Sequence, residues 1–400
     1  MASILIDGSV LEGGGQILRN SVSLSALLSK PVSIHQIRNN RTPPGLKNQH
    51  RTGIELAARI SSAKLTGAKN GSREIEFVPG TINLPNHYTA DTVTAGSITL
   101  LLQIALPLLL FAPKPVQAST LTLLGGTNAT MAPQVDYTKH VFLPFLRRHF
   151  GIENVNLSIH KRGYFPRGGG EVSLRVVPFA GQDQKLRPCR LMQRGKVKWI
   201  AGVAHYAGLH AKVGKGMVAG ATQRLAAAGF GLGKQRKTHN ETTVEHPERN
   251  DIPVSISCTR EPNNLTKGAG SGIVLWAELE GGGFIGGSAV GTKNVSPEEV
   301  GEEAAEELIK GLQEDGCVDE WLQDQIIIFM ALADGQSEVR CGTAGLSLHT
   351  RTAIWVAERL TEAKFEIEEE ESGHTIIRCQ GIGYTMPRIP DTEKGTCQSS

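Results

Sequence analysis

Short apolar segments of strand character alternate along this chain with apolar segments of helical periodicity. The first pair runs from 4 to 28, where a strand-like Ile-Leu-Ile leads through Gly13–Gly15 into apolar positions spaced along one helix face. Strands and helices then recur in order further along the chain. This order predicts an α/β protein in which helices are layered on sheets.

The same periodicities predict strands and helices over most of the chain, and glycine triplets recur between them. Glycine triplets at 13–15, 168–170 and 281–283 suggest a repeated unit, although no clean repeat period is visible. Residues 155–176 fit a strand, a glycine-rich turn and a strand, and 194–229 fit a strand followed by a helix. Other helices are expected at 48–63, 92–111, 137–150, 297–312, 318–332 and 349–360, and other strands at 74–78, 121–124, 273–276, 365–369 and 375–379.

The composition changes near Arg187. Residues 230–270 are polar and rich in Asn, Thr, Glu and Pro, which predicts a long loop within a small inserted domain. We therefore expect a large domain formed by 1–186 and 286–400, interrupted by an inserted α/β domain at 187–285. The segment after Pro387 has no periodicity, so a mobile C-terminal tail is expected.

Charge and apolar content argue against several classes of protein. The 400 residues include 42 Lys and Arg against 39 Asp and Glu, a balance unlike that of proteins that coat long nucleic acids. A protein that grips one nucleic-acid end needs few basic residues. The longest apolar run, 98–112, is too short to span a bilayer, and the first residues lack the basic and apolar regions of a signal peptide. For these reasons no membrane partner is expected. Six cysteines without metal-ligand or disulfide spacing favour a reducing compartment.

A glycine-rich turn opens the first predicted helix, in the run EGGGQILR from Glu12 to Arg19. Glycine lets a backbone approach an anion, and the unpaired N–H groups of a helix N-terminus suit phosphate. Glu12 could hold a divalent metal that bridges phosphates, and Arg19 lies one to two turns into the helix, where it could reach the same anion. For the motif taken alone, a tight turn with a surface Glu and Arg is the commoner explanation.

Two arginines three residues apart precede a rigid turn. Arg38 and Arg41 are followed by a Pro-Pro-Gly sequence at 43–45 and then by Gln49, at the start of the second predicted helix. Guanidinium groups match phosphate oxygens bidentately, and the prolines and glycine fix the direction of the chain. The segment predicts a phosphate-binding loop or, with equal weight, a solvated basic loop.

Small residues at 95–97 and 125–127 would allow a ligand to approach the backbone closely. Gln103 follows the first of these segments, and Pro133 follows the second and offers a flat apolar face for a base. A pair of ordinary turns is the simpler explanation of these segments when each is taken alone.

The C-terminal third carries an aromatic and polar helix face and a histidine at a helix start. On a helix, Trp321, Asp324 and Gln325 share one face and could stack on a purine and hydrogen-bond to it. His349 could cap its helix or, if its ring is neutral and oriented by a partner, act as a nucleophile toward phosphorus. A core-edge Trp and a structural His are the simpler explanations of each feature alone.

Taken together, these segments resemble the RNA 3'-terminal phosphate cyclase family and look most like its eukaryotic cyclase branch. The resemblance covers about 4–230 and 270–385 and implies a large domain of repeated βαβαββ-like units with a smaller inserted domain. It is carried, in chain order, by DGSxxEGGGQILR, IRxxRxxPGLxxQH, TAGSITLLLQ, GGTNAxMAPQxDY, RGYFPRGGGEV, GSGIVLWAE, VDEWLQDQ and SLHTRTAI.

The resemblance also implies a role for each matching residue. His349 is expected to attack the α-phosphorus of ATP and become adenylated, and Glu12 to contact Mg²⁺ or Mn²⁺. Trp321 stands where family members commonly have Tyr, and it is expected to stack on adenine opposite Pro133. The expected nucleoside contacts are Gln103, Asp324 and Gln325, and the expected phosphate contacts are Arg19, Arg38, Arg41 and Gln49.

The activity implied is ATP-dependent conversion of an RNA 3'-phosphate end into a 2',3'-cyclic phosphodiester. Two alternatives stay open: a catalytically inactive relative that acts in ribosome biogenesis, and a small-molecule transferase of the enolpyruvyl type on a related repeated fold. The inactive relative is disfavoured by the presence of His349 together with Trp321, Asp324 and Gln325.

The eukaryotic-type resemblance implies residence in the nucleoplasm, or alternatively in the cytoplasm. The basic residues at 234–237 are either part of a nuclear signal or, more commonly for so short a run, a solvated loop. The oligomeric state does not follow from the sequence.

Overall fold

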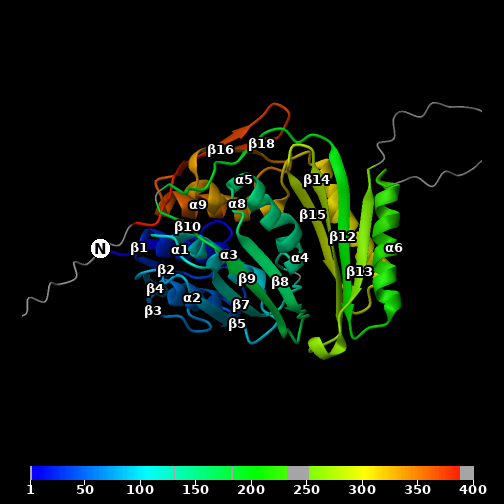
Figure 1. Cartoon of the computed structure of the whole chain (residues 1–400), viewed down its shortest axis with the longest axis horizontal. Coiled ribbons are helices and arrows are strands. Elements are labelled where there is room, and N and C mark those ends of the chain that lie inside the picture. The colour runs from blue at the N-terminus through cyan, green and yellow to red at the C-terminus, as the bar shows by residue number, and fades with distance from the viewer. Residues whose placement is uncertain (1, 130, 182, 232–251, 388–400) are drawn as a thin grey trace, which may run out of the picture.

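Mixed sheets covered by helices form the described part of this computed structural model, which comprises residues 2–129, 131–181, 183–231 and 252–387 (Figure 1). Within these residues the strands form four four-stranded sheets and one two-stranded sheet. This arrangement confirms the predicted α/β layering. None of the helices in the described segments is both long and apolar enough to cross a membrane.

The first unit shows the topology on which the large part of the molecule is built. Strand order is β1-β2-β4-β3, with β1 parallel to β2 and β4 antiparallel to both of its neighbours. Its elements are β1 (Ile4–Asp7), α1 (Gly15–Leu28), β2 (Val32–His35), α2 (Asn48–Ile60), β3 (Lys64–Thr66) and β4 (Ile75–Val78).

Two further units repeat this βαβαββ topology, with sheet orders β5-β7-β9-β8 and β11-β16-β18-β17. The repeated units of the prediction are therefore present. The second unit contains β5 (His87–Asp91), α3 (Ile98–Leu109), β7 (Ser119–Gly125), α4 (Val135–Tyr137), the π-helical η1 (Thr138–Phe142), α5 (Leu143–Phe150), β8 (Val155–Lys161) and β9 (Gly170–Val176). The third contains β11 (Arg190–Leu191), α8 (Glu320–Leu332), β16 (Asp334–Arg340), α9 (Leu348–Leu360), β17 (Lys364–Glu369) and β18 (Thr375–Ile382). The two-stranded sheet is formed by β6 (Phe111–Ala112) and β10 (Phe179–Ala180).

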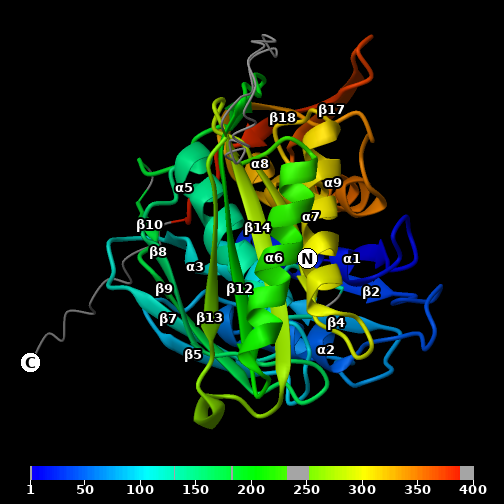
Figure 2. The same ribbon diagram turned by 90° about the vertical axis from the view of Figure 1, so that its right-hand side faces the viewer.

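The third unit is interrupted between β11 and α8 by an inserted sheet of order β13-β12-β14-β15. Its strands are β12 (Val197–Ala207), β13 (Val254–Arg260), β14 (Gly270–Leu279) and β15 (Phe284–Val290), with the 3-10 turn η2 (Asn263–Leu265). Two helices, α6 (Ala211–Ala227) and α7 (Pro297–Gln313), cover one face of this sheet (Figure 2). The predicted domain limits of 187 and 285 stay predictions. Strand β11, which follows residue 187, pairs within the sheet of the third unit, and α7, which follows residue 285, packs on the inserted sheet.

Close approach of α6 and α7 depends on glycine. A Cβ atom on Gly220 would lie 2.0 Å from the carbonyl oxygen of Glu298, and one on Gly301 would lie 2.0 Å from that of Met217. The two helices and the inserted sheet enclose a hydrophobic core of their own, separate from the larger core that the three units share. The insertion therefore has its own packed interior.

Two sequence predictions of secondary structure were wrong in detail. The helix expected at 92–111 begins at Ile98, because Ser97 pairs with Gly126 in a short bridge and the Thr92 hydroxyl bonds to nearby carbonyls. Part of the loop expected at 230–270 is strand β13, which pairs in parallel with β12. The predicted tail after Pro387 and the basic run at 234–237 lie outside the described residues.

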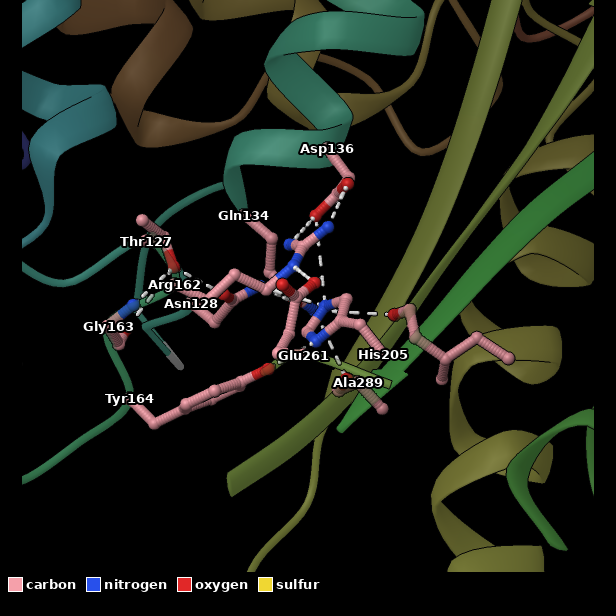
Figure 3. Close-up of polar contacts among 11 residues, drawn as sticks. Thr127, Asn128, Gln134, Asp136, Arg162, Gly163, Tyr164, His205, Glu261 and Ala289 are labelled. Carbon is pink, nitrogen blue, oxygen red and sulfur yellow. Dashed lines mark hydrogen bonds and ion pairs between the residues drawn. The ribbon is translucent and has the colours of Figure 1, made fainter. Parts of the chain in front are cut away.

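A buried ion-pair network joins the second unit to the insertion (Figure 3). Arg162, just after β8, donates to both carboxylate oxygens of Asp136 on α4, one of them at 2.9 Å. The same guanidinium donates to Glu261, just after β13, at 2.6 Å. A buried charge without partners is strongly destabilising, so these bonds fix how the insertion sits on the second unit.

His205 on β12 lies in the centre of this network. Its ring nitrogens contact the Tyr164 hydroxyl at 2.9 Å and the Asn128 side-chain amide at 3.1 Å, and the ring is completely buried. Burial is the main reason that the pKa of His205 falls from 6.5 to about 3; Arg162 adds to this shift and Asp136 opposes it. The ring is therefore neutral in the folded protein at neutral pH.

We expect His205→Gln to reduce the pH dependence of stability. The unfolded chain takes up a proton on this ring as the pH falls below about 6.5, whereas the folded chain does so only near pH 3, so acid lowers the free energy of unfolding over this range. One linked proton gives about 1.4 kcal/mol per pH unit. Urea denaturation at a series of pH values should show a shallower slope of unfolding free energy against pH for His205→Gln than for wild type, and an unchanged slope for the exposed control His87→Gln. Equal slopes for all three proteins would contradict the assignment.

Candidate active site

A cavity of about 540 Å³ lies where helices of the three repeated units meet. Gln325 is the one predicted site residue that does not line it; its amide donates to the Trp321 carbonyl at 2.6 Å, and its side chain lines a small adjoining space together with Gln103. The predicted residues that do line the cavity are Glu12, Arg19, Arg38, Arg41, Gln49, Gln103, Pro133, Trp321, Asp324 and His349.

Most of these residues belong to the first two turns of a helix. In each unit a helix follows a strand of the parallel pair, so these helices start at the carboxyl ends of the strands, where open α/β sheets commonly bind ligands. The N-caps of α1 and α3, Gly14 and Ser97, make no side-chain capping bond to the helix. Uncapped N–H groups and the positive ends of helix dipoles favour an anion in this cavity.

The glycine-rich turn brings a carboxylate and a guanidinium close to the start of α1. A Cβ atom on Gly14 would lie 1.9 Å from Oε1 of Glu12, and one on Gly15 would lie 2.8 Å from Nη1 of Arg19. Any larger residue at either position would push these groups aside. The glycines therefore make room for Glu12 and Arg19 as well as for a ligand.

Glu12 connects the glycine-rich turn to the arginine loop and to α9. Its Oε1 accepts a hydrogen bond from Nη2 of Arg41 at 2.8 Å and lies 3.6 Å from Nε2 of His349. Its backbone N–H donates to the Thr352 hydroxyl at 3.1 Å. The second oxygen, Oε2, is buried, and no described residue donates to it. Three segments far apart in sequence thus meet at one carboxylate.

The ring of His349 is accessible, and its surroundings favour the neutral form. Its side chain is 47% exposed and lines the cavity, so an incoming group can reach it. Burial lowers the pKa of His349 below its usual value, and the Glu12 carboxylate is the main opposing influence. A neutral imidazole keeps a free lone pair on one ring nitrogen, which a nucleophile requires.

The three predicted arginines differ in their surroundings. Arg19 and Arg38 are buried, and burial lowers the pKa of each guanidinium. Nη1 of Arg38 donates to the carbonyls of Pro43 and Gly45 at 3.0 and 2.9 Å, so this side chain shapes the Pro-Pro-Gly turn. Arg19 donates to Gln16, but its Nε has no partner among the described residues. Unsatisfied buried donors of this kind suit an anionic ligand.

Aromatic, apolar and acidic groups line another part of the cavity. Trp321 donates its indole N–H to Oε1 of Glu307 at 2.9 Å, and the Thr99 hydroxyl donates to the carbonyl of Pro133 at 2.9 Å. Burial raises the pKa of Asp324 to about 7, with Arg19 as the main opposing charge. A carboxyl group with that pKa can either accept or donate a hydrogen bond near neutral pH.

Comparison with known proteins identifies the family. The model for "RNA 3'-terminal phosphate cyclase" matches residues 10–367. The chain belongs to the RNA 3'-terminal phosphate cyclase family. Similar proteins include a probable RNA 3'-terminal phosphate cyclase of Dictyostelium discoideum, 40% identical over 95% of this chain and 83% of its own length. The RNA 3'-terminal phosphate cyclase of Drosophila melanogaster is 39% identical over 96% of this chain and 98% of its own length. That of Pyrobaculum neutrophilum is 38% identical over 96% of this chain and 99% of its own length.

Several cavity residues of this cyclase-family chain were not predicted as site residues. His50 on α2 is buried, and burial together with Arg19, Arg38 and Lys47 lowers its pKa to about 3. Its Nδ1 accepts the backbone N–H of Lys47 at 3.2 Å. The sequence signal was the adjacency of His50 to Gln49, but a His within an amphipathic helix is more often structural. The other lining residues that were not predicted are Gln16, Asn40, Thr42, Lys47, Leu100 and Met131, while Gly14 and Gly15 belong to the glycine-rich turn already expected near an anion.

One carboxylate of this cyclase-family site, that of Glu12, has a chemistry that suits a divalent cation. The described residues contain no group of three or more His, Cys, Asp or Glu arranged to hold a metal ion. Glu12 nevertheless offers an unpaired, buried Oε2 within the cavity. Mg²⁺ commonly takes one or two protein carboxylates and completes its coordination with water and substrate phosphates. Glu12 therefore suits a cation that a phosphorylated ligand helps to hold.

We expect Glu12→Gln to lower the pKa of His349 further. The anionic carboxylate 3.6 Å from Nε2 favours the protonated ring, and a neutral amide would not. NMR titration of isotopically labelled histidine rings would measure the change, with His349→Ala used to assign the signal. The exposed Glu303→Gln should leave the His349 titration unchanged. An unchanged or raised pKa in Glu12→Gln would show that Glu12 does not act on this ring.

Proposed function

We propose that this chain uses ATP to convert the 3'-phosphate end of RNA into a 2',3'-cyclic phosphodiester through an AMP covalently bound to His349. Family membership supports the overall reaction. The observation that supports the covalent route is the accessible imidazole of His349, 3.6 Å from Glu12 in a cavity lined by Arg19, Arg38 and Arg41. An uncharged nucleophile beside several cations matches attack on a polyphosphate.

In the first step, the lone pair of the His349 ring attacks the α-phosphorus of ATP. A nitrogen–phosphorus bond forms, the bond to the bridging oxygen breaks, and pyrophosphate leaves with the electron pair. The arginines and the helix N-termini offset the negative charge that develops on the phosphate oxygens. A divalent cation held at Glu12, Mg²⁺ or Mn²⁺, would supply further neutralisation of that charge when bound.

In the next two steps the RNA end is activated and closed. An oxygen of the 3'-phosphate attacks the AMP phosphorus, the nitrogen–phosphorus bond breaks, and His349 is regenerated. The neighbouring 2'-hydroxyl oxygen then attacks the 3'-phosphorus, its proton passes to water, and AMP leaves. Because the last attack is intramolecular, proximity supplies much of the rate. Adenylation is needed because an unmodified phosphate oxygen leaves poorly.

The aromatic and polar side of the cavity is proposed to hold the nucleoside. Trp321 and Pro133 both line it and offer flat faces for adenine. Asp324 and Gln103 are proposed to hydrogen-bond to the nucleoside. For Gln325, which bonds to the Trp321 carbonyl from an adjoining space, we propose a contact that requires its amide to turn.

The alternatives differ from this proposal in what they require of the cavity. An inactive relative in ribosome biogenesis needs no nucleophile, and an enolpyruvyl-type transferase forms no covalent nucleotide. His349, Glu12 and the arginines together support the cyclase. Residence in the nucleus is proposed on the resemblance to eukaryotic members alone.

We expect His349→Ala to abolish both the labelled protein and the cyclic product. The protein would be incubated with Mg²⁺ and ATP radiolabelled at the α-phosphate and then run on a denaturing gel, and a 3'-phosphorylated RNA would be assayed in parallel. Loss of a covalent nucleophile should reduce turnover by at least about 10³-fold. The exposed His87→Ala is the control and should behave as wild type.

Each outcome separates the candidate functions. An unlabelled wild-type protein that forms no cyclic ends would favour the inactive relative or the transferase. Normal cyclisation by His349→Ala would refute the nucleophile while leaving the cyclase activity in place.

A further inference from the structure

The inserted sheet presents an edge strand, β15, to the helix that carries Trp321 and Asp324. In the sheet order β13-β12-β14-β15, β15 is the edge strand. Strand β14 pairs with one of its sides, and on the other side the described residues form a single bridge, between Phe284 and Val318. The N–H groups of alternate residues in an edge strand point away from its partner and need other acceptors. Here the N–H groups of Gly286 and Ser288 donate to the carboxylates of Asp319 and Glu307, each at 2.7 Å.

Both carboxylates also bind the start of α8. Asp319 caps this helix by accepting the N–H of Leu322 at 2.8 Å, and it accepts the Tyr137 hydroxyl at 2.7 Å as well. Glu307 on α7 accepts the indole N–H of Trp321 at 2.9 Å. Each acid therefore links an edge N–H of β15 to the first turn of α8, which fixes the helix and the Trp321 ring relative to the insertion.

The other predicted adenine contact is tied to the same strand. The amide nitrogen of Gln134 donates to the carbonyl of Ala289 on β15 at 3.1 Å (Figure 3). It also donates to the carbonyl of Ile273 on β14 at 3.3 Å. Its oxygen accepts from Asn128 at 2.6 Å. Gln134 directly follows Pro133, so the backbone that presents Pro133 to the cavity is also held by the insertion.

We propose that β15 sets the spacing between Trp321 and Pro133, and that Glu307 is a positioning residue that holds the Trp321 ring for adenine. This inference rests on the proposed function of the cavity as an ATP site. The insertion lies between β11 and α8 of the third unit. None of its described residues lines the cavity, so it would act on the nucleotide through α8.

Glu307 is suited to this role because its carboxylate has two oxygens for two N–H donors. A glutamine of the same shape has one acceptor oxygen, and its NH₂ group would face the other N–H. Glu307→Gln therefore releases either Trp321 or Ser288. In a Trp321→Phe background the indole N–H is gone, so the glutamine oxygen can bond to Ser288 without conflict. The effect of Glu307→Gln should then depend on which residue occupies position 321.

The test is a double-mutant cycle of Glu307→Gln and Trp321→Phe, with the exposed Glu303→Gln on the same helix as control. AMP binding would be measured by calorimetry, because AMP binds without reacting, together with KM for ATP and kcat. We expect Glu307→Gln to weaken AMP binding and raise KM for ATP about tenfold, the size of one lost hydrogen bond to a charged group, while kcat changes less than about twofold. In the Phe background the same change should have less than about a twofold effect.

The outcomes distinguish this inference from the proposed function. Equal losses from Glu307→Gln in the Trp and Phe backgrounds, or no loss in either, would overturn the positioning role and leave the cyclase proposal intact. A fall in kcat together with the unfolding midpoint would indicate a general structural role and would also overturn it. A wild-type protein that bound neither AMP nor ATP would overturn both.

Discussion

The first turns of α1, α2, α3, α8 and α9 converge on one cavity, and the chemistry of the site depends on this convergence. It follows from the repeated topology, because each unit places its helices after the strands of a parallel pair. Uncapped N–H groups, helix dipoles and the buried Arg19 all favour negative charge at the same place. Glu12 supplies part of that charge, and a ligand rich in phosphate would supply the rest.

The insertion helps to orient α8 of the third unit through contacts that lie outside the repeated βαβαββ topology. Strand β11 and helix α8 are neighbours in the repeated topology, but the whole inserted sheet separates them in sequence. The edge of that sheet is covered by Asp319 and Glu307 and so is not free for pairing with another strand. The two carboxylates that protect this edge are the same carboxylates that hold the start of α8.

Much of the fold could be predicted from sequence because the relevant signals are local, whereas most of the cavity residues were assigned through the family resemblance. Apolar periodicity located the helices, and the glycine-rich turn marked the start of α1. The start of α3 was misplaced because the bonds that hold 92–97 outside the helix come from Gly126 and Leu124, which are distant in sequence. Strand β13 alternates apolar and polar residues at Val254–Cys258, but it was missed because the surrounding segment is polar and was taken as a whole for a loop.

The remaining features depend on tertiary contacts that leave no local pattern. His50 becomes a cavity residue only because α2 packs beside the glycine-rich turn, and the bond between Glu307 and Trp321 joins two helices across the edge of a sheet. The meeting of Glu12, Arg41 and His349 likewise joins segments from the two ends of the chain. The motifs indicated which residues matter, whereas the repeated topology brings them together.

Mass-spectrometric mapping of the peptide that carries AMP tests the central claim most directly. After incubation of the full chain with ATP and Mg²⁺ alone, the proposal predicts a single acid-labile AMP group, bound through nitrogen to the ring of His349. AMP on a lysine or on another histidine, or no adduct under conditions in which cyclic ends are formed, would contradict it.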